Sequence, residues 1–181
     1  MVTTTVRAEI AHSLAVAERT RQPIPPLIET YPSLDVADAY EIALLGIRRR
    51  VADGGRVVGH KVGLSSPAMQ QMMGVDEPDY GHLLDDMELS ESEPVDISRF
   101  CRPRIEVEIA FVLGADLPGE DCTDDDVRAS TAAVAASLEL IDSRIADWRI
   151  GICDTIADNA SSAGFVLGER RASLSEVEPR N

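Results

Sequence analysis

Two glutamates separated by one residue stand in the apolar run IEVEIAFVL, residues 105–113. The run begins with strict alternation and becomes continuously apolar, a pattern typical of a strand entering a core. Successive side chains of a strand alternate between its faces, so Glu106 and Glu108 share one face. Carboxylates placed in this way can share a divalent cation. A solvated strand face that carries two acids is the competing interpretation of the local pattern.

A third acid, Glu139, stands between two leucines in the next apolar segment, 137–141, which is also predicted as a strand. Three clustered carboxylates would repel one another unless a cation neutralised them. All-oxygen ligation favours Mg²⁺ or Mn²⁺ over zinc. Such an ion could bind the carboxylate and the 2-oxygen of an α-oxo acid and stabilise the enolate. Asp79 and Asp142 are the alternatives if Glu139 is not the third ligand.

Lys61 lies in VVGHKVGL, a glycine-flanked apolar run over residues 57–64 that predicts a strand. An ammonium group in such a run suits a substrate carboxylate or a developing oxyanion. A strand-edge lysine in water is the alternative. The neighbouring His60 should face the other way, and we interpret it as structural.

Two polar turns complete the candidate residues. Asp79, in the sequence PDYG, could hold its own backbone in a turn or act in a site. The small polar segment DNASSAG, residues 158–164, suits either a turn or a loop that contacts substrate.

The elements that must position these residues are predicted from hydrophobic periodicity and capping. A first helix covers 6–17 and ends before a proline-rich linker. A second covers 36–51, with Asp35 as its N-cap and two glycines after it. A short helix is expected to begin at Pro67 after a serine cap and to end at Gly74. An alanine-rich helix is expected from Thr123 through Ala136. Residues 78–96 predict a loop with one or two short strands.

The overall composition bounds the class of protein. The 181 residues fit one domain with a single core, and 44% are apolar and 27% charged, as in ordinary globular proteins. A net charge of −15 argues against nucleic acid and anionic membranes as partners. Three cysteines without a CxxC pair, and an N-terminus with charges among its apolar residues, favour a reducing cytoplasm without a targeting segment.

Four blocks of the sequence resemble, in order, the 2-keto-4-pentenoate hydratase family of the fumarylacetoacetate hydrolase superfamily. They are GHKVGLSSPAMQQMMGVDEPDYGHLLDDM, RPRIEVEIAFVL, SLELIDSRI and DTIADNASSAGFVLG, and the match runs from about residue 10 to residue 168. The resemblance implies a mixed α/β fold, with an N-terminal helical region over 1–55 and a partial β-roll catalytic region over 56–181, together one folding unit. Family members continue through further strands, so we expect a β-roll that lacks its C-terminal strands.

The resemblance also implies roles for particular residues. Glu106, Glu108 and Glu139 match the family's Mg²⁺ or Mn²⁺ ligands, Lys61 and Asp79 its active-site pair, and Ser161 a substrate-contacting serine. A homo-oligomer is expected. We therefore predict a cytoplasmic hydratase that adds water to 2-hydroxypenta-2,4-dienoate or a close homologue in aromatic or steroid ring meta-cleavage. The alternatives are a 4-oxalocrotonate-type 2-oxo acid decarboxylase and an inactive truncated remnant of the family.

Overall fold

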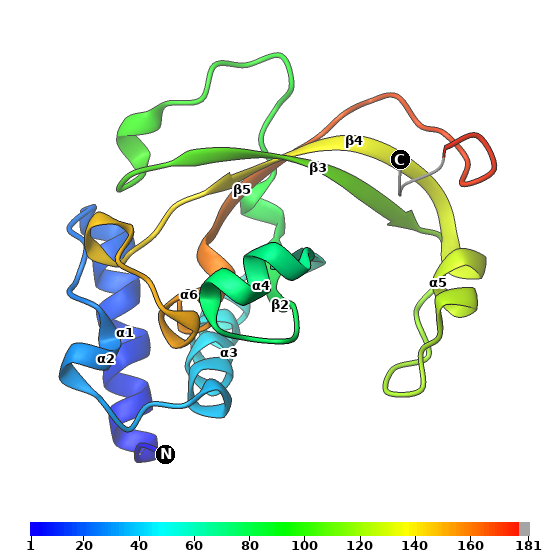
Figure 1. The fold of residues 1–181 in the computed structure, drawn as a ribbon. Helices are drawn as coiled ribbons and strands as arrows, with labels where there is room; N and C mark the ends of the chain where they lie inside the picture. Colours follow the sequence, from blue (N-terminus) through cyan, green and yellow to red (C-terminus); the bar gives the residue numbers. More distant parts are fainter. Residues whose placement is uncertain (178–181) are drawn as a thin grey trace.

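The computed structural model describes residues 1–177 and places a group of helices at one end of a long, curved sheet (Figure 1). The helices are α1 (Thr4–Thr20), α2 (Leu27–Thr30), α3 (Val36–Ala52), α4 (Pro67–Met73), α5 (Asp124–Ser130) and α6 (Ile152–Ala157). The strands are β1 (Val57–Gly63), β2 (Asp79–Leu84), β3 (Arg104–Leu113), β4 (Thr131–Ile141) and β5 (Ser162–Leu167). Within residues 1–177, no helix combines the length and the apolar character needed to cross a membrane.

The caps confirm the predicted start of α3 and the predicted start and end of α4. The Asp35 side chain accepts a hydrogen bond from the backbone N–H of Asp38 at the start of α3. Ser66 does the same for Met69 at the start of α4, and Gly74 ends that helix in the left-handed conformation. These side chains satisfy backbone donors that the first turn of a helix leaves free.

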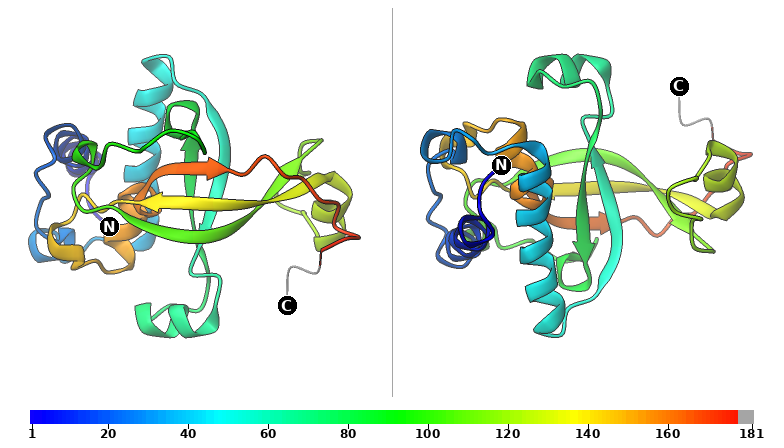
Figure 2. Two further views of the ribbon diagram at one scale, coloured as in Figure 1. Left: turned by 90° about the horizontal axis from the view of Figure 1, so that it is seen from above. Right: turned by 90° about the horizontal axis from the view of Figure 1, so that it is seen from below.

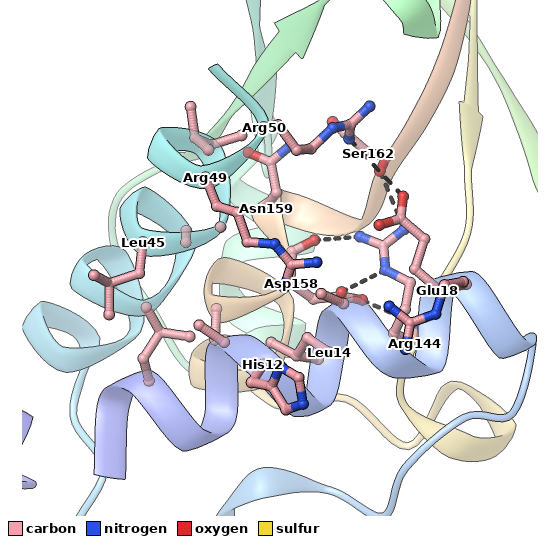
Figure 3. Close-up of a pocket in the computed structure, with 18 of the residues that line it drawn as sticks. His12, Leu14, Glu18, Leu45, Arg49, Arg50, Arg144, Asp158, Asn159 and Ser162 are labelled. Atoms are coloured by element: carbon pink, nitrogen blue, oxygen red, sulfur yellow. Dashed lines mark hydrogen bonds and ion pairs between the residues drawn. The ribbon is translucent and has the colours of Figure 1, made fainter. Parts of the chain in front are cut away.

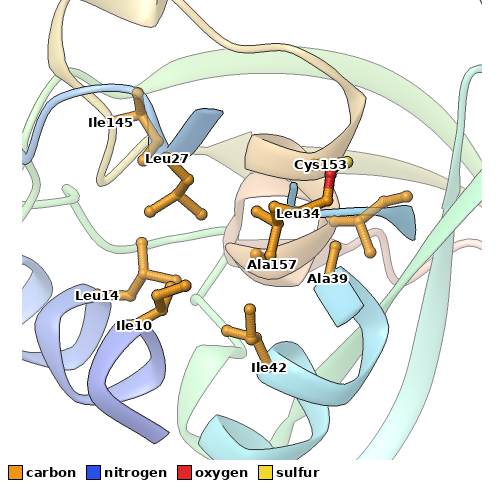
Figure 4. Packing of buried hydrophobic residues seen from close by; sticks show 10 residues of the cluster. Ile10, Leu14, Leu27, Leu34, Ala39, Ile42, Ile145, Cys153 and Ala157 are labelled. Atoms are coloured by element: carbon orange, nitrogen blue, oxygen red, sulfur yellow. Dashed lines mark hydrogen bonds between the residues drawn. The ribbon is translucent and has the colours of Figure 1, made fainter. Parts of the chain in front are cut away.

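The main hydrophobic core lies between the helices rather than within the sheet. Apolar side chains of α1, α2, α3 and α6 meet there with Ile145 from the segment after β4 (Figure 4). Ile10, Ile42 and Ile156 are almost completely buried. A second, smaller cluster forms around Leu84 and Met87, so the described chain has two apolar clusters where the sequence predicts one.

The strands form two separate antiparallel sheets. The three-stranded sheet has the order β3-β4-β5, and β1 pairs with β2 in a two-stranded ribbon. Seen from above and below, the ribbon crosses the direction of the larger sheet, with α4 at its far end (Figure 2). The ribbon and the sheet approach each other beside the helices, through contacts of β2 with β5 and with the turn before β5.

Two sequence expectations are wrong here. The helix expected through Ala136 ends at Ser130, and the strand expected over 137–141 already begins at Thr131. The cause is tertiary pairing: Thr131 to Ala136 lie opposite β3 in an antiparallel ladder, and this pairing overrides the helical propensity of alanine.

The apolar face of β3 differs from expectation as well. The alternation predicts a strand entering a core, yet Ile105, Val107 and Ile109 are 68%, 84% and 46% exposed. Within the described residues, β3 is an edge strand and this face has no covering layer. The alternation itself is confirmed, because the acidic residues lie on the other face.

Candidate metal centre

Three glutamates come together where the sheet faces the ribbon. Each of Glu106, Glu108 and Glu139 offers a carboxylate oxygen within 4.8 Å of the others. The β3–β4 register is the cause, since it sets Glu106 directly opposite Glu139, with Glu108 two residues along the same face. Like charges directly opposite each other destabilise a sheet, so a cation bound between these carboxylates would relieve their repulsion.

Lys61 reaches this cluster from the ribbon. Its ammonium nitrogen lies 3.4 Å from Glu139 Oε2 and donates a hydrogen bond to the Ala160 carbonyl at 3.2 Å. The side chains of Lys61 and Glu139 are 12% and 6% exposed. Lys61 is the only lysine in the sequence.

Asp79 lies on the same face of the ribbon as Lys61. In the β1–β2 register, Lys61 pairs with Gly81 and Gly63 pairs with Asp79, which makes the two charged residues diagonal neighbours. Asp79 is 4% exposed, and its Oδ1 has no hydrogen-bond partner within the described chain. A side chain at Gly63 would collide with this oxygen and approach Lys61 Nζ to 3.2 Å. An unpaired buried carboxylate oxygen is costly, so it points to an additional ligand or proton.

Burial shifts Glu108, Glu139 and the nearby Asp79 toward their protonated forms. Desolvation raises the pKa of Glu139, although Lys61 and the Ser162 hydroxyl oppose the shift. The pKa of Glu108 is raised by desolvation and then by the neighbouring charge of Glu106. Desolvation also raises the pKa of Asp79, against the effect of Lys61. A bound cation would reverse this preference, because it stabilises the ionised carboxylates.

The serine predicted to contact substrate lies beside a threonine. Ser161 is buried, and its Oγ lies 3.4 Å from Thr155 Oγ1. Its neighbour Ser162 donates a hydrogen bond of 3.0 Å to Glu139 Oε1. Sequence reasoning singled out the polar segment 158–164 but not the serine within it that contacts a glutamate.

Asp142 and His60 make contacts that explain their positions outside the glutamate cluster. Asp142 accepts hydrogen bonds from the backbone N–H groups of Cys101 and Arg102, at 2.8 and 2.6 Å, so its carboxylate holds a loop. His60 lies on the opposite face of the ribbon from Lys61, with its ring centroid 4.8 Å from that of His82.

The turn before β5 has an unusual backbone that the sequence did not reveal. Asn159, Ala160 and Ser161 all have φ between 51° and 57°, the left-handed region that residues other than glycine seldom occupy. Strain of this kind persists only where the surroundings fix it, and it is common at functional sites. The carbonyl that accepts from Lys61 is the one in the middle of this turn.

A buried ion pair between Arg144 and Asp158 holds the turn before β5 in place. The Arg144 guanidinium bonds the Asp158 carboxylate at 2.5 Å, the Asp158 carbonyl at 2.6 Å and the Ser162 carbonyl at 3.1 Å. The pair lines a cavity of about 610 Å³ between α1 and α3, whose other walls include Leu14 and Arg50 (Figure 3). The glutamate cluster does not line this cavity.

Solved structures with the same fold exist. The chain superposes with a TM-score of 0.93 and 37% identity on the 4-oxalocrotonate decarboxylase from Pseudomonas putida G7 complexed with magnesium and adipate, covering 100% of this chain and 69% of that one. The same decarboxylase complexed with calcium and acetate gives a TM-score of 0.93 at 36% identity, over 100% of this chain and 68% of that one. The architecture is therefore that of the fumarylacetoacetate-hydrolase-like enzymes.

Curated relatives give the narrower classification. The 2-keto-4-pentenoate hydratase of Paraburkholderia xenovorans (strain LB400) is 48% identical over 162 residues, 90% of this chain and 60% of the relative. The 2-hydroxypent-2,4-dienoate hydratase of Pseudomonas putida is 44% identical over 171 residues, 94% of this chain and 77% of the relative. No family model matches the chain. The chain belongs to the 2-keto-4-pentenoate hydratase family, and it spans about three fifths of the length of the first of these relatives.

Proposed function

We propose that the chain binds Mg²⁺ or Mn²⁺ through Glu106, Glu108 and Glu139 and acts as a hydro-lyase. The proposed reaction adds water to 2-hydroxypenta-2,4-dienoate, or a close homologue, and yields a 4-hydroxy-2-oxo acid of aromatic or steroid ring catabolism. The observation that carries the proposal is the convergence of three carboxylates and the only lysine across two sheets. The names of the relatives support the choice of reaction.

The residues present fit a hard divalent cation. The three ligand groups are all carboxylates, which Mg²⁺ and Mn²⁺ prefer, and no histidine or cysteine belongs to the cluster. The unpaired Oδ1 of Asp79 indicates that the site also needs a partner on its ribbon side. A bound cation with open coordination positions would supply Lewis-acid stabilisation of charge on the substrate 2-oxygen.

Lys61 and Asp79 would orient the substrate and move protons. The Lys61 ammonium is largely buried, and in such surroundings it would attract a substrate carboxylate more strongly than it would in solvent. Burial raises the pKa of Asp79, so its carboxyl holds a proton more readily than a solvated aspartate. Conversion of a dienol into a 4-hydroxy-2-oxo acid requires protonation of the substrate carbon chain, and Asp79 Oδ1 is suited to carry that proton.

A second candidate function is decarboxylation of a 4-oxalocrotonate-type 2-oxo acid. The observation that favours it is the superposition on a 4-oxalocrotonate decarboxylase over the whole of this chain. Hydration remains the first proposal because the relatives at 48% and 44% identity are named hydratases.

A paired assay separates the two reactions. With Mn²⁺ present, 2-hydroxypenta-2,4-dienoate and 2-oxo-3-hexenedioate are followed spectrophotometrically, and CO₂ release is measured for the second. We expect consumption of the dienoate without CO₂ release. Consumption of the hexenedioate alone, with CO₂, would show the decarboxylase, and metal binding without turnover of either compound would indicate an inactive member of the family.

The metal site has its own test. Glu106→Gln, Glu108→Gln and Glu139→Gln each remove one charged ligand and should weaken Mn²⁺ binding in calorimetry by about tenfold or more, equivalent to about 1.4 kcal/mol. Glu93→Gln, an exposed glutamate outside the cluster, is the matched control. Unchanged affinity in all three variants would refute the site.

We further propose a cytoplasmic homo-oligomer. The three cysteines are free, which suits a reducing compartment, and the exposed apolar face of β3 suits burial against another chain. Sedimentation at several protein concentrations measures the assembly, and a monomer at every concentration would contradict it.

A further inference from the structure

We infer that Asn159 is a positioning residue for Lys61: its side-chain amide ties the left-handed turn to β2, so that the Ala160 carbonyl meets the lysine ammonium. This inference rests on the proposed function only in giving Lys61 a role in the reaction. The bonds of the Asn159 amide and the hydrogen bond from Lys61 to Ala160 involve none of the three glutamates, although the Lys61 ammonium also pairs with Glu139.

The amide of Asn159 makes a two-point contact with the ribbon. Its Oδ1 accepts from the backbone N–H of His82 at 2.8 Å, and its Nδ2 donates to the carbonyl of the same residue at 2.9 Å. The side chain therefore pairs with β2 as a neighbouring strand would. Because both bonds go to one residue, they fix the direction of the amide as well as its distance.

The position of His82 makes this contact relevant to Lys61. His82 pairs with His60 and the preceding Gly81 pairs with Lys61, so the amide contacts the ribbon one residue from the partner of the lysine. A side chain at Gly81 would come within 2.5 Å of the Asn159 carbonyl. The turn is thus pressed against the ribbon at the level of Lys61.

The chemistry of asparagine also suits its backbone. Asn159 has a φ of 55°, and asparagine tolerates the left-handed conformation better than most residues. Ala160, which follows at φ 51°, has no side-chain group that could hold it there. Its carbonyl direction must therefore be set by its neighbours, and Asn159 is the neighbour that is bonded to the ribbon.

Other bonds to the turn do not replace this one. Arg144 holds Asp158 and the Ser162 carbonyl, and the N–H of Asp142 bonds the Ser161 carbonyl at 2.9 Å. These contacts fix the turn to the base of β4 and the segment after it. Only the Asn159 amide, among the bonds just described, fixes the turn to the ribbon that carries Lys61 (Figure 3 shows its position beside Arg144 and Asp158).

The single lysine allows a direct measurement. Protein grown with ¹⁵N-lysine gives one ammonium signal, from Lys61, whose exchange with water reports the bond to Ala160. Asn159→Gly keeps a residue that accepts positive φ but loses both bonds to His82. We expect it to speed exchange at Lys61 about tenfold, the factor equivalent to one hydrogen bond of ordinary strength. We also expect lower turnover with unchanged Mn²⁺ affinity.

Two comparisons keep the test decisive. Asn159→Asp keeps an acceptor for the His82 N–H but sets a second oxygen against its carbonyl, and we expect an intermediate change. Ile42→Val lowers stability from within the helical core without removing a hydrogen bond of the turn, and should leave the lysine signal as in the wild type. A folded Asn159→Gly or Asn159→Asp variant with an unchanged signal, or an equal change in Ile42→Val, would overturn the inference. Retained Mn²⁺ affinity in the glutamate variants would instead refute the proposed metal site, whatever the lysine signal shows.

Discussion

The ammonium of Lys61 and the carboxylate of Glu139 lie 3.4 Å apart although they belong to different sheets. Lys61 comes from the ribbon, and Glu139 comes from the central strand of the larger sheet. The pair therefore joins the two sheets at the glutamate cluster. It also places the Lys61 ammonium beside the site proposed for the cation, where it suits the role toward a substrate that we propose for it.

This relationship predicts opposite effects on turnover and metal binding when Lys61 is replaced. Lys61→Met should lower turnover by about a hundredfold or more, the usual contribution of a group that handles protons or fixes substrate. At alkaline pH, where Glu139 is ionised with or without the lysine, Mn²⁺ affinity should be equal or higher because a competing cation is gone. His60→Gln, on the other face of β1, is the control. Loss of Mn²⁺ binding in Lys61→Met would mean that the lysine instead builds the metal site.

The glutamate cluster predicts that stability and metal binding move in opposite directions. In the absence of metal, Glu106→Gln removes one charge from a cluster in which burial raises the pKa of Glu139 and the charge of Glu106 adds to the shift. Its melting temperature without metal should rise, while its stabilisation by Mn²⁺ should shrink. Thermal unfolding with and without Mn²⁺ measures both, with Glu93→Gln for comparison. A lower melting temperature without metal would contradict the repulsion argument.

Much of this site could be predicted from sequence because strand alternation is simple. The spacing of Glu106 and Glu108 places them on one face whatever the surroundings, and Glu139 stands out as an acid between two leucines. The approach of Lys61 to Glu139 could not be predicted by periodicity, because it depends on how two sheets cross. The resemblance to the family supplied that grouping.

Other features depend on contacts between distant residues. The alanines at the start of β4 have helical propensity, and only their pairing with β3 makes them a strand. The left-handed turn at Asn159 carries no glycine, which is the usual sequence signal for positive φ. Ser162, and not Ser161, bonds Glu139 because of the backbone of that turn. Local sequence patterns therefore could not predict which serine contacts the glutamate.

Gly63 provides a test of how tightly the ribbon packs at the site. Gly63→Ala would push a methyl group into Asp79 Oδ1, whereas the same change at Gly59, on the same face of β1, meets only Leu83 at 3.8 Å. We expect Gly63→Ala to cost about 1–3 kcal/mol of unfolding free energy and to impair turnover, and Gly59→Ala to be much milder. Urea denaturation and the dienoate assay measure the difference. Equal effects of the two substitutions would show that Asp79 can move aside freely.

The contacts of Asp38 in α3 predict how the stability of the protein changes in acid. Its carboxylate accepts from the N–H of Val2 and from Arg7, and although burial alone would raise its pKa, these partners hold the pKa below the ordinary value of 3.8. A lowered pKa in the folded state means that the ionised form stabilises the fold above the unfolded pKa, and that this stabilisation is lost as pH falls through the folded pKa. Asp38→Asn should therefore be less stable than the wild type at neutral pH, with a gap that narrows in strong acid. A gap of constant size across a pH series of urea denaturation curves would show that the charge contributes nothing.

Two of the arginine–carboxylate pairs, one buried and one exposed, allow a direct comparison. Arg144 and Asp158 are 6% and 2% exposed at the side chain, whereas Arg149 and Glu29, joined at 2.8 Å, are 56% and 51% exposed. Arg144→Met leaves the Asp158 charge buried and should cost about 3–5 kcal/mol of unfolding free energy. Arg149→Met should cost less than about 1 kcal/mol, because water replaces the exposed partner.

The double variant identifies the source of this cost. Most of the lost stability could come from the Asp158 carboxylate, which Arg144→Met leaves buried without a partner. In that case, Arg144→Met combined with Asp158→Asn should recover part of the stability lost in Arg144→Met alone. If the cost comes instead from the bonds of Arg144 to the Asp158 and Ser162 carbonyls, the double variant should be no more stable than the single one. Urea denaturation followed by the fluorescence of Trp148, the only tryptophan, distinguishes the two outcomes. Because Arg144 also supports the turn beside Lys61, the ¹⁵N signal of the lysine in the double variant would show whether stability and positioning can be restored separately.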